Sequence, residues 1–249
     1  MLKFLKYGTG GVLAAIVLAM GGYLAWSVAN EAAPAPAAIE ALVSDDAVTV
    51  TDGDYVVFRP AGPPPSLGVV VYPGAGCDVR GYAPVLRRIA RRGYLVVAVP
   101  MPFNMAIFGI NRIDEVRAAF PEVSRWVLLG HSMGGAMAAS YAHEHPAGLD
   151  GLVIWDSRPA ESATLVDVQY PVWHIHRATP DGQPPPKFAK YRELFPVSST
   201  WVPLPGGNHM QFGSFVGGTY EEEWAARIGP AEQHDLVVTA TLNALLAME

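Results

Sequence analysis

A serine flanked by glycines is the residue of this chain best suited to chemistry. Residues 130–134 read GHSMG, a G-x-S-x-G sequence with Ser132 at its centre. A serine hydroxyl is a poor nucleophile at neutral pH, so it needs a neighbouring base, which is often a histidine oriented by a carboxylate. The motif predicts attack of the hydroxyl on an acyl carbon, provided that the fold supplies both partners.

The chain has seven histidines that could be the base. His209 stands in the sequence PGGNH, after the last expected strand and before the last expected helix, where it completes the chain order serine, acid, histidine. His131 lies inside the motif and cannot turn back onto its neighbour. His174 and His176 share one face of a strand, and we expect them to pack there rather than to bind a metal. We predict that His209 is the base.

Two aspartates are candidates for the acid that orients His209. Asp181 follows the strand expected at residues 172–176, and Asp156 follows the strand expected at residues 152–155. Both would lie near the carboxyl edge of a parallel sheet. We predict Asp181 and keep Asp156 as the alternative; the ordinary structural role of Asp181 would be that of a turn residue in its Pro-Asp-Gly sequence.

Backbone N–H groups are the expected donors to the oxyanion that such an attack creates. We predict the amide of Met133, at the start of the helix after the motif, and the amide of Ala75, in the loop PGAG at residues 73–76. Gly74 and Gly76 are the alternatives to Ala75. Cys77, the only cysteine, follows the wrong strand to be a nucleophile, and a lone cysteine excludes an intramolecular disulfide.

The elements around these residues alternate between strand and helix. Continuous apolar runs are typical of buried parallel strands, and stretches with apolar residues at helical spacing separate them. The strands are expected at 48–51, 55–58, 68–72, 94–99, 125–129, 152–155, 172–176 and 201–204, and the helices at 82–92, 113–120, 136–145 and 230–248. The pattern predicts an α/β fold with a doubly wound, mostly parallel sheet.

The first thirty residues form a separate segment. Lys3 and Lys6 precede residues 7–30, which carry no charge and would span about 36 Å as a helix, against about 30 Å for a bilayer core. We predict a transmembrane signal anchor at 1–30, a linker at 31–46 and a domain at 47–249 outside the cytoplasm. A cleaved secretory signal, which would release the domain, and a buried helix of the domain are the alternatives.

The amino-acid composition and net charge of the chain limit the classes of molecule that it could bind. The chain has 51% hydrophobic and 16% charged residues, so most of it is expected to fold. Its formal net charge of −6 and the lack of a basic stripe argue against binding to nucleic acid. The sequence gives no sign of a metal or an organic cofactor, and it does not predict an oligomeric state.

Several stretches resemble the α/β-hydrolase superfamily and, more narrowly, a bacterial subfamily of small, lidless hydrolases. They are YPGAG at 72–76, GYLVV at 93–97, MPFN at 101–104, WVLLGHSMGGA at 126–136 and GGNHMQFG at 206–213. The resemblance implies the α/β-hydrolase fold and an ester-cleaving activity, with Ser132 as nucleophile, Asp181 as acid and His209 as base. The chain departs from this family after Asp181, where DGQPPPK replaces the usual short Asp-Gly-Leu stretch.

An open site follows from the short connection after Asp156. Residues 157–170 are too few for the helical cap that many members of the superfamily insert there. Phe103 and Phe108, with Met105 and Ile107 between them, are predicted to face the substrate, and a place in the core is the alternative.

We predict a membrane-anchored serine hydrolase that cleaves a small-molecule ester through an acyl-enzyme intermediate, with a thioester or an amide as a less favoured substrate. The alternatives are an acyltransferase that uses the same residues and a membrane-tethered binding protein without catalysis.

Overall fold

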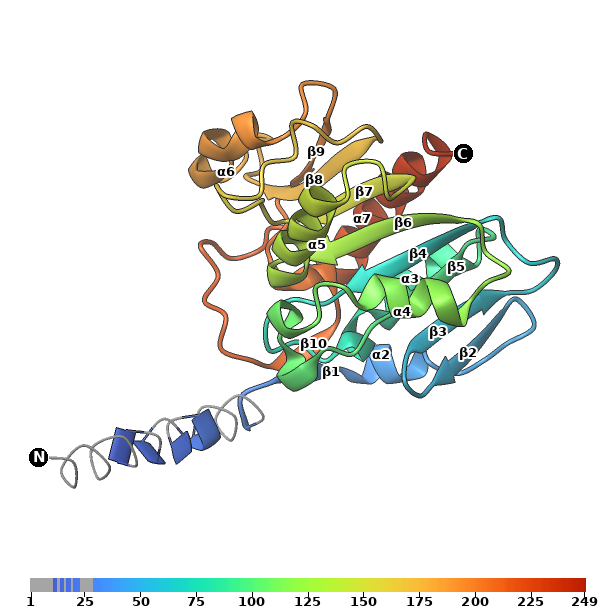
Figure 1. The fold of residues 1–249 in the computed structure, drawn as a ribbon, viewed down its shortest axis with the longest axis horizontal. Helices are drawn as coiled ribbons and strands as arrows, with labels where there is room; N and C mark the ends of the chain where they lie inside the picture. The colour runs from blue at the N-terminus through green and yellow to red at the C-terminus, as the bar shows by residue number, and fades with distance from the viewer. Residues whose placement is uncertain (1–10, 13, 16, 19, 23–28) are drawn as a thin grey trace, which may run out of the picture.

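An eight-stranded sheet runs through the centre of the molecule. The computed structural model describes residues 11, 12, 14, 15, 17, 18, 20–22 and 29–249, and its sheet has the order β2-β3-β5-β4-β6-β7-β8-β9 (Figure 1). The strands are β2 (Val48–Asp52), β3 (Val56–Pro60), β4 (Leu67–Tyr72), β5 (Leu95–Ala98), β6 (Arg125–His131), β7 (Gly151–Trp155), β8 (Val172–Ala178) and β9 (Thr200–Pro205).

Most neighbours in this sheet are parallel. β2 and β3 form an antiparallel hairpin, and β3 is also antiparallel to β5, whereas all pairs from β5 through β4 to β9 are parallel. The predicted mostly parallel α/β sheet is therefore confirmed. Parallel strands bring their carboxyl ends to one edge, so the loops that follow β4, β6, β7, β8 and β9 meet there.

Helices cover both faces of the sheet. α4 (Arg112–Ala119) and α5 (Met133–Glu144) pack on one face, and α3 (Ala83–Ala90) and α7 (Pro230–Leu246) pack on the other (Figure 1). The shorter helices are α2 (Pro36–Glu40), α6 (Pro186–Tyr191), η1 (Val79–Tyr82), η2 (Pro102–Asn104), η3 (Ala106–Phe108), η4 (Arg192–Leu194) and η5 (Met210–Phe212).

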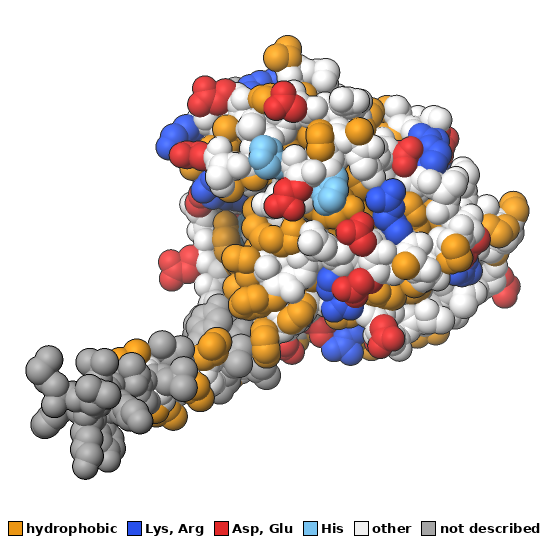
Figure 2. Space-filling model, viewed as in Figure 1, with side chains coloured by type: hydrophobic (Ala, Val, Ile, Leu, Met, Phe, Trp, Pro, Cys, Tyr) orange, Lys and Arg blue, Asp and Glu red, His pale blue; other side chains and the backbone are white. Residues whose placement is uncertain are grey.

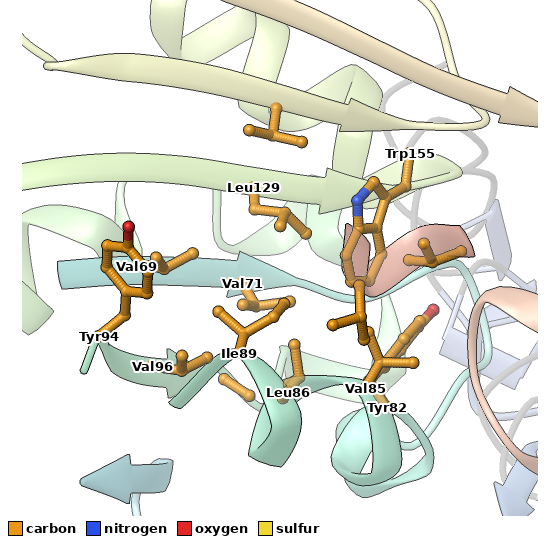
Figure 3. Packing of buried hydrophobic residues seen from close by; sticks show 14 of the residues in the cluster. Val69, Val71, Tyr82, Val85, Leu86, Ile89, Tyr94, Val96, Leu129 and Trp155 are labelled. Atoms are coloured by element: carbon orange, nitrogen blue, oxygen red, sulfur yellow. The ribbon is translucent and has the colours of Figure 1, made fainter. Parts of the chain in front are cut away.

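The core has two layers because successive side chains of a strand point to opposite faces. Val69 and Val71 of β4 pack with Leu86 and Ile89 of α3 in one layer (Figure 3). Val70, between them, packs in the other layer with residues of α4 and α5. Burial on both faces explains why these strands read as continuous apolar runs.

The predicted membrane segment lies largely outside the described residues. Those of its positions that are described between 11 and 22 are helical, and their side chains are exposed. Within the described part of the chain, no helix combines the length and the apolar character that crossing a bilayer requires.

The predicted linker at 31–46 is instead part of the folded unit. β1 (Ala32–Pro34) pairs antiparallel with β10 (Phe215–Gly217), and α2 follows β1 directly. The side chains of Ala32 and Ala38 are buried, and the Arg87 guanidinium donates a hydrogen bond to the carbonyl oxygen of Ala41 at 3.1 Å. The Ala-rich composition that suggested a spacer gives side chains small enough to pack closely against the domain.

Candidate active site

The G-x-S-x-G sequence forms a sharp turn between β6 and α5. Ser132 lies between the two elements with φ 52° and ψ −122°, in a region that non-glycine residues rarely adopt. A Cβ atom on Gly130 would lie 2.3 Å from the carbonyl oxygen of Gly134, and one on Gly134 would lie 2.2 Å from the carbonyl oxygen of Tyr72. The strand and the helix can approach this closely only because both positions are glycine, and the turn exposes the serine hydroxyl at the sheet edge.

Ser132 and His209 lie together. The Oγ atom of Ser132 is 2.9 Å from Nε2 of His209, a hydrogen-bonding distance. His209 follows β9 and immediately precedes η5, in the loop where the sequence placed it. The imidazole is therefore positioned to accept the proton of the serine hydroxyl.

The acid beside His209 is Asp156, and the prediction of Asp181 is wrong. Oδ2 of Asp156 lies 2.5 Å from Nδ1 of His209, and Asp156 is buried directly after β7. Asp181 lies on an exposed turn beyond the end of β8, where its Oδ1 accepts a hydrogen bond from the hydroxyl of Thr179 at 2.5 Å. Asp181 is thus the turn residue that its Pro-Asp-Gly sequence allowed, and the alternative, Asp156, takes its place.

The neighbours of Asp156 stabilise its ionised form. Burial alone would raise the pKa of this carboxyl, but the hydrogen bond from His209 and the positive charge of Arg177 outweigh burial and lower the pKa below its usual range. Asp156 is therefore a carboxylate at neutral pH. A carboxylate in contact with Nδ1 fixes the tautomer that leaves Nε2 free to accept the serine proton.

A neutral histidine joins the turn to the loop after β4. Burial lowers the pKa of His131 well below its ordinary value. The amide of Gly74 donates to the hydroxyl of Tyr82 at 3.0 Å, so that hydroxyl can donate to Nδ1 of His131, 2.8 Å away. This chain of hydrogen bonds fixes the 73–76 loop relative to Ser132.

The two predicted oxyanion donors stand at the same edge. The amide of Gly74 is taken by Tyr82, and that of Gly76 donates to the carbonyl oxygen of Asn104 at 2.8 Å. The Ala75 amide has no hydrogen-bond partner among the described residues, whereas the amides of both alternatives donate hydrogen bonds within the fold. The Met133 amide begins α5, where the first N–H groups of a helix have no partner within the helix.

A comparison of the sequence with family profiles shows the family of the chain. The profile described as the alpha/beta hydrolase family matches residues 68–235, which is more than half of the chain. The chain belongs to the alpha/beta hydrolase family. No curated protein matches this hydrolase in sequence.

Solved structures share the fold of this hydrolase at low sequence identity. Est1E from Butyrivibrio proteoclasticus is 12% identical, with a TM-score of 0.54 over 80% of this chain and 99% of that one. TT1662 from Thermus thermophilus is 14% identical, with a TM-score of 0.58 over 81% and 98%. The ferulic acid esterase from Streptomyces cinnamoneus is 19% identical, with a TM-score of 0.54 over 75% and 68%.

Two hollows of the hydrolase adjoin Ser132. One, of about 240 Å³, is lined by Ser132, His209, residues 74–77, residues 218–220, Asn30 and Ala32. The other, of about 370 Å³, lies toward α6, and its walls include Met133, Ser157, Arg158 and Phe188. The connection from β7 to β8 contains no helix or strand that could close over them.

Phe103 and Phe108 line neither of these hollows, so the structure does not place them where the sequence predicted. Their side chains are 50% and 59% exposed, and their rings pack against each other at 5.9 Å between centroids. Hydrophobic side chains gather on one face of the molecule (Figure 2). Neighbouring Asn104 instead supports the 73–76 loop through its carbonyl oxygen.

A loop at residues 218–229, which the sequence did not predict as part of the site, packs around His209. The ring of Tyr220 stacks on the His209 ring with centroids 4.1 Å apart. The carboxylate of Glu222 accepts hydrogen bonds from the amides of His209 at 3.0 Å and Met210 at 2.7 Å. No motif marks this loop, although an acidic run, EEEW, so close to the histidine was a usable signal.

The predicted packing role of His174 and His176 agrees with their surroundings. Nε2 of His174 is 2.8 Å from the carbonyl oxygen of Ser157, and the two imidazole rings stack 5.0 Å apart. Burial lowers the pKa of His174 to about 3. Among the residues that the structure describes, no group of His, Cys, Asp and Glu side chains has the arrangement needed to hold a metal ion.

Proposed function

We propose that this alpha/beta hydrolase is a serine hydrolase that cleaves carboxylic esters, with Ser132 as nucleophile, His209 as base and Asp156 as the acid that orients it. The observation that carries the proposal is the hydrogen-bonded series from Ser132 Oγ to His209 Nε2 at 2.9 Å and from His209 Nδ1 to Asp156 Oδ2 at 2.5 Å. The first distance lies within hydrogen-bond reach of a proton transfer, and the second brings the carboxylate of Asp156 into direct contact with Nδ1.

The first half of the reaction forms an acyl-enzyme. His209 takes the proton from Ser132 as Oγ attacks the ester carbonyl carbon, and the carbonyl oxygen becomes an oxyanion that the amides of Ala75 and Met133 stabilise. The ester C–O bond then breaks. His209 passes its proton to the leaving alkoxide, which departs as an alcohol and leaves the acyl group on Ser132.

The second half releases the acid. A water molecule loses a proton to Nε2 of His209 and attacks the acyl carbon, and a second oxyanion forms beside the same two amides. Its collapse breaks the bond to Oγ and returns the proton to Ser132. Asp156 stays ionised throughout and stabilises the imidazolium form of His209, because its charge lies in contact with Nδ1.

An ester is the favoured substrate for two reasons. Esterases are among the proteins that share this fold, including the Streptomyces cinnamoneus ferulic acid esterase. Both hollows beside Ser132 are open, so water can reach the acyl-enzyme, which favours hydrolysis over acyl transfer. A thioester or an amide would pass through the same steps with a different leaving group.

Labelling with a fluorophosphonate probe tests the nucleophile. The wild-type protein should be labelled and should hydrolyse p-nitrophenyl esters of graded chain length, whereas Ser132→Ala should do neither while keeping the same thermal unfolding curve. Equal labelling of the two folded proteins would refute the assignment. Product analysis with added alcohols separates hydrolysis from acyl transfer, since an acyltransferase would form new esters.

We also propose that the segment at 1–30 anchors the hydrolase in a membrane, with the domain outside the cytoplasm. The support is the uncharged sequence at 7–30 after Lys3 and Lys6. The full chain, expressed in a bacterial host, should stay in the membrane fraction after alkaline carbonate washing, and a protease added outside the inner membrane should digest its domain. A soluble product whose mass lacks the first thirty residues would support the cleaved signal instead.

A further inference from the structure

A buried arginine contacts the acid and the base of the proposed site. Arg177 is near the end of β8, and β8 lies between β7, which Asp156 follows, and β9, which leads to His209. Its side chain is 1% exposed, although arginine is among the residues least often buried. The order of strands thus places a guanidinium between the two groups, and the reaction described above does not use it.

The guanidinium and the imidazole share one carboxylate oxygen. Nη1 of Arg177 donates a hydrogen bond to Oδ2 of Asp156, the same atom that lies 2.5 Å from Nδ1 of His209. Nη1 and Nδ1 are themselves 3.1 Å apart. The backbone amide of Arg177 donates to the other oxygen, Oδ1, at 3.1 Å. Arg177 therefore competes with His209 for the negative charge of Asp156.

The far end of the guanidinium reaches the 218–229 loop. Nη2 of Arg177 lies 3.1 Å from the carboxylate of Glu223 and 3.5 Å from the hydroxyl of Tyr220. The guanidinium carbon is 5.3 Å from the centre of the Trp224 ring. Glu223 is partly exposed and also pairs with Lys187 at 2.5 Å, so its charge is shared with solvent and with a second cation.

The buried Asp156–Arg177 pair sets the net charge beside His209. Asp156 has no exposed side-chain surface, and an isolated buried carboxylate would favour a protonated imidazole beside it. Arg177 already neutralises Asp156, so the buried pair carries no net charge while His209 is neutral. Protonation of His209 would then place a second cation about 3 Å from the guanidinium, which is unfavourable.

We propose that Arg177 is a positioning residue that, by holding part of the charge of Asp156, keeps His209 able to accept a proton at lower pH than an unaided Asp–His pair would allow. The inference rests on the proposed function. Among the described residues, the other polar and titratable groups that face His209 are the neutral ring of His131, 4.5 Å away between centroids, the hydroxyl of Tyr220, and Glu222 through the backbone amide.

The test is the pH dependence of kcat/KM for p-nitrophenyl ester hydrolysis in Arg177→Met, Arg177→Lys and the wild type. Methionine keeps the length and removes the charge, so the acidic limb of its profile should move to higher pH by about one unit. Lysine keeps the charge, so its acidic limb should stay within about 0.3 units of the wild type. Arg88→Met, which removes an exposed arginine paired with Asp235 on the surface, is the matched control and should not shift.

The inference would be overturned if the acidic limb does not move in a folded Arg177→Met variant, even if the kcat of that variant falls. A merely structural role of Arg177 predicts lower activity with an unchanged pH dependence. If Arg177→Met does not fold, Glu223→Gln decides: it frees the guanidinium for Asp156, so the acidic limb should move to lower pH, and no movement overturns the inference. Failure of the wild type to react with a fluorophosphonate would refute the proposed function instead, so the two failures are distinguishable.

Discussion

Replacing each candidate acid by asparagine separates the two assignments sharply. In Asp156→Asn, one carboxylate oxygen becomes an NH₂ group in a buried site where three donors face two acceptors: Nη1 and the backbone amide of Arg177, and Nδ1 of His209. If the NH₂ group takes the Oδ2 position, His209 must present an acceptor at Nδ1, and its Nε2 then carries the proton and cannot accept one from Ser132. If it takes the Oδ1 position, it faces the backbone amide, and the imidazolium still loses the negative charge beside it.

Either orientation removes a stabilisation that exists only when His209 is charged. We therefore expect kcat to fall by about 10⁴-fold, which corresponds to about 5.5 kcal/mol of transition-state stabilisation. Among the described residues, the same change leaves the buried guanidinium of Arg177 with one ionic partner, the partly exposed Glu223. Loss of one member of a buried pair typically costs about 3–5 kcal/mol of stability, so the variant should also unfold at a lower denaturant concentration.

The assay is steady-state hydrolysis of a p-nitrophenyl ester at pH 7.5, with circular dichroism to show that each variant is folded at the assay temperature. Asp181→Asn is the matched control, since Asp181 is exposed and, among the described residues, its side chain is hydrogen-bonded only to Thr179 of its own turn. Its kcat should stay within about twofold of the wild type. A folded Asp156→Asn protein that keeps more than a tenth of the activity, or a loss of 10³-fold in Asp181→Asn, would refute the reasoning.

Three further predictions concern the support of the site. Gly134→Ala places a Cβ atom 2.2 Å from the carbonyl oxygen of Tyr72, so the variant should lose more than about 2 kcal/mol of stability in urea unfolding, and an unchanged midpoint would contradict the tight turn. His131 and His174 are buried and have lowered pKa values, so below about pH 6.5 the unfolded chain binds protons that the folded chain does not. The free energy of unfolding should therefore fall by about 1.4 kcal/mol per pH unit for each histidine as the pH drops below that value. A urea midpoint that stays constant between pH 7 and pH 5 would contradict the neutral state of the two histidines. Glu222→Ala removes the acceptor of two backbone amides beside the histidine base, so kcat for p-nitrophenyl ester hydrolysis should fall by up to about 10²-fold, and full activity would show that the loop does not position the base.

The elements that local sequence specifies were predictable. Buried parallel strands need continuous apolar runs, and the turn at Ser132 needs glycine at two positions where any side chain would collide with backbone. His209 could be chosen from seven histidines because a loop between the last strand and the last helix ends at the carboxyl edge of the sheet. These predictions needed only the order of the elements along the chain.

The acid was not predictable from order alone, because both aspartates follow strands of the same sheet. The difference lies in where the chain goes after each strand ends. β8 continues to Ala178, and the amide of Thr179 then donates to the carbonyl oxygen of Gln183 at 2.9 Å, which holds Asp181 on an outward turn. Asp156, with φ 45°, turns at the very end of β7 and stays under the neighbouring loops. The sequence pattern shows neither the outward turn after β8 nor the tight turn at the end of β7.

The segment at 31–46 was misassigned for a related reason, and its true place matters to the site. Small residues between prolines are typical of a linker, but here they form the strand β1 that runs beside the 73–76 loop. The amide of Ala32 donates to the carbonyl oxygen of Gly76 at 2.8 Å, and the amide of Asp78 donates to the carbonyl oxygen of Ala32 at 3.1 Å. Because Ala32 also lines the hollow beside Ser132, the segment belongs to the wall of the site, and a domain boundary at residue 47 would remove part of the support of the Ala75 amide.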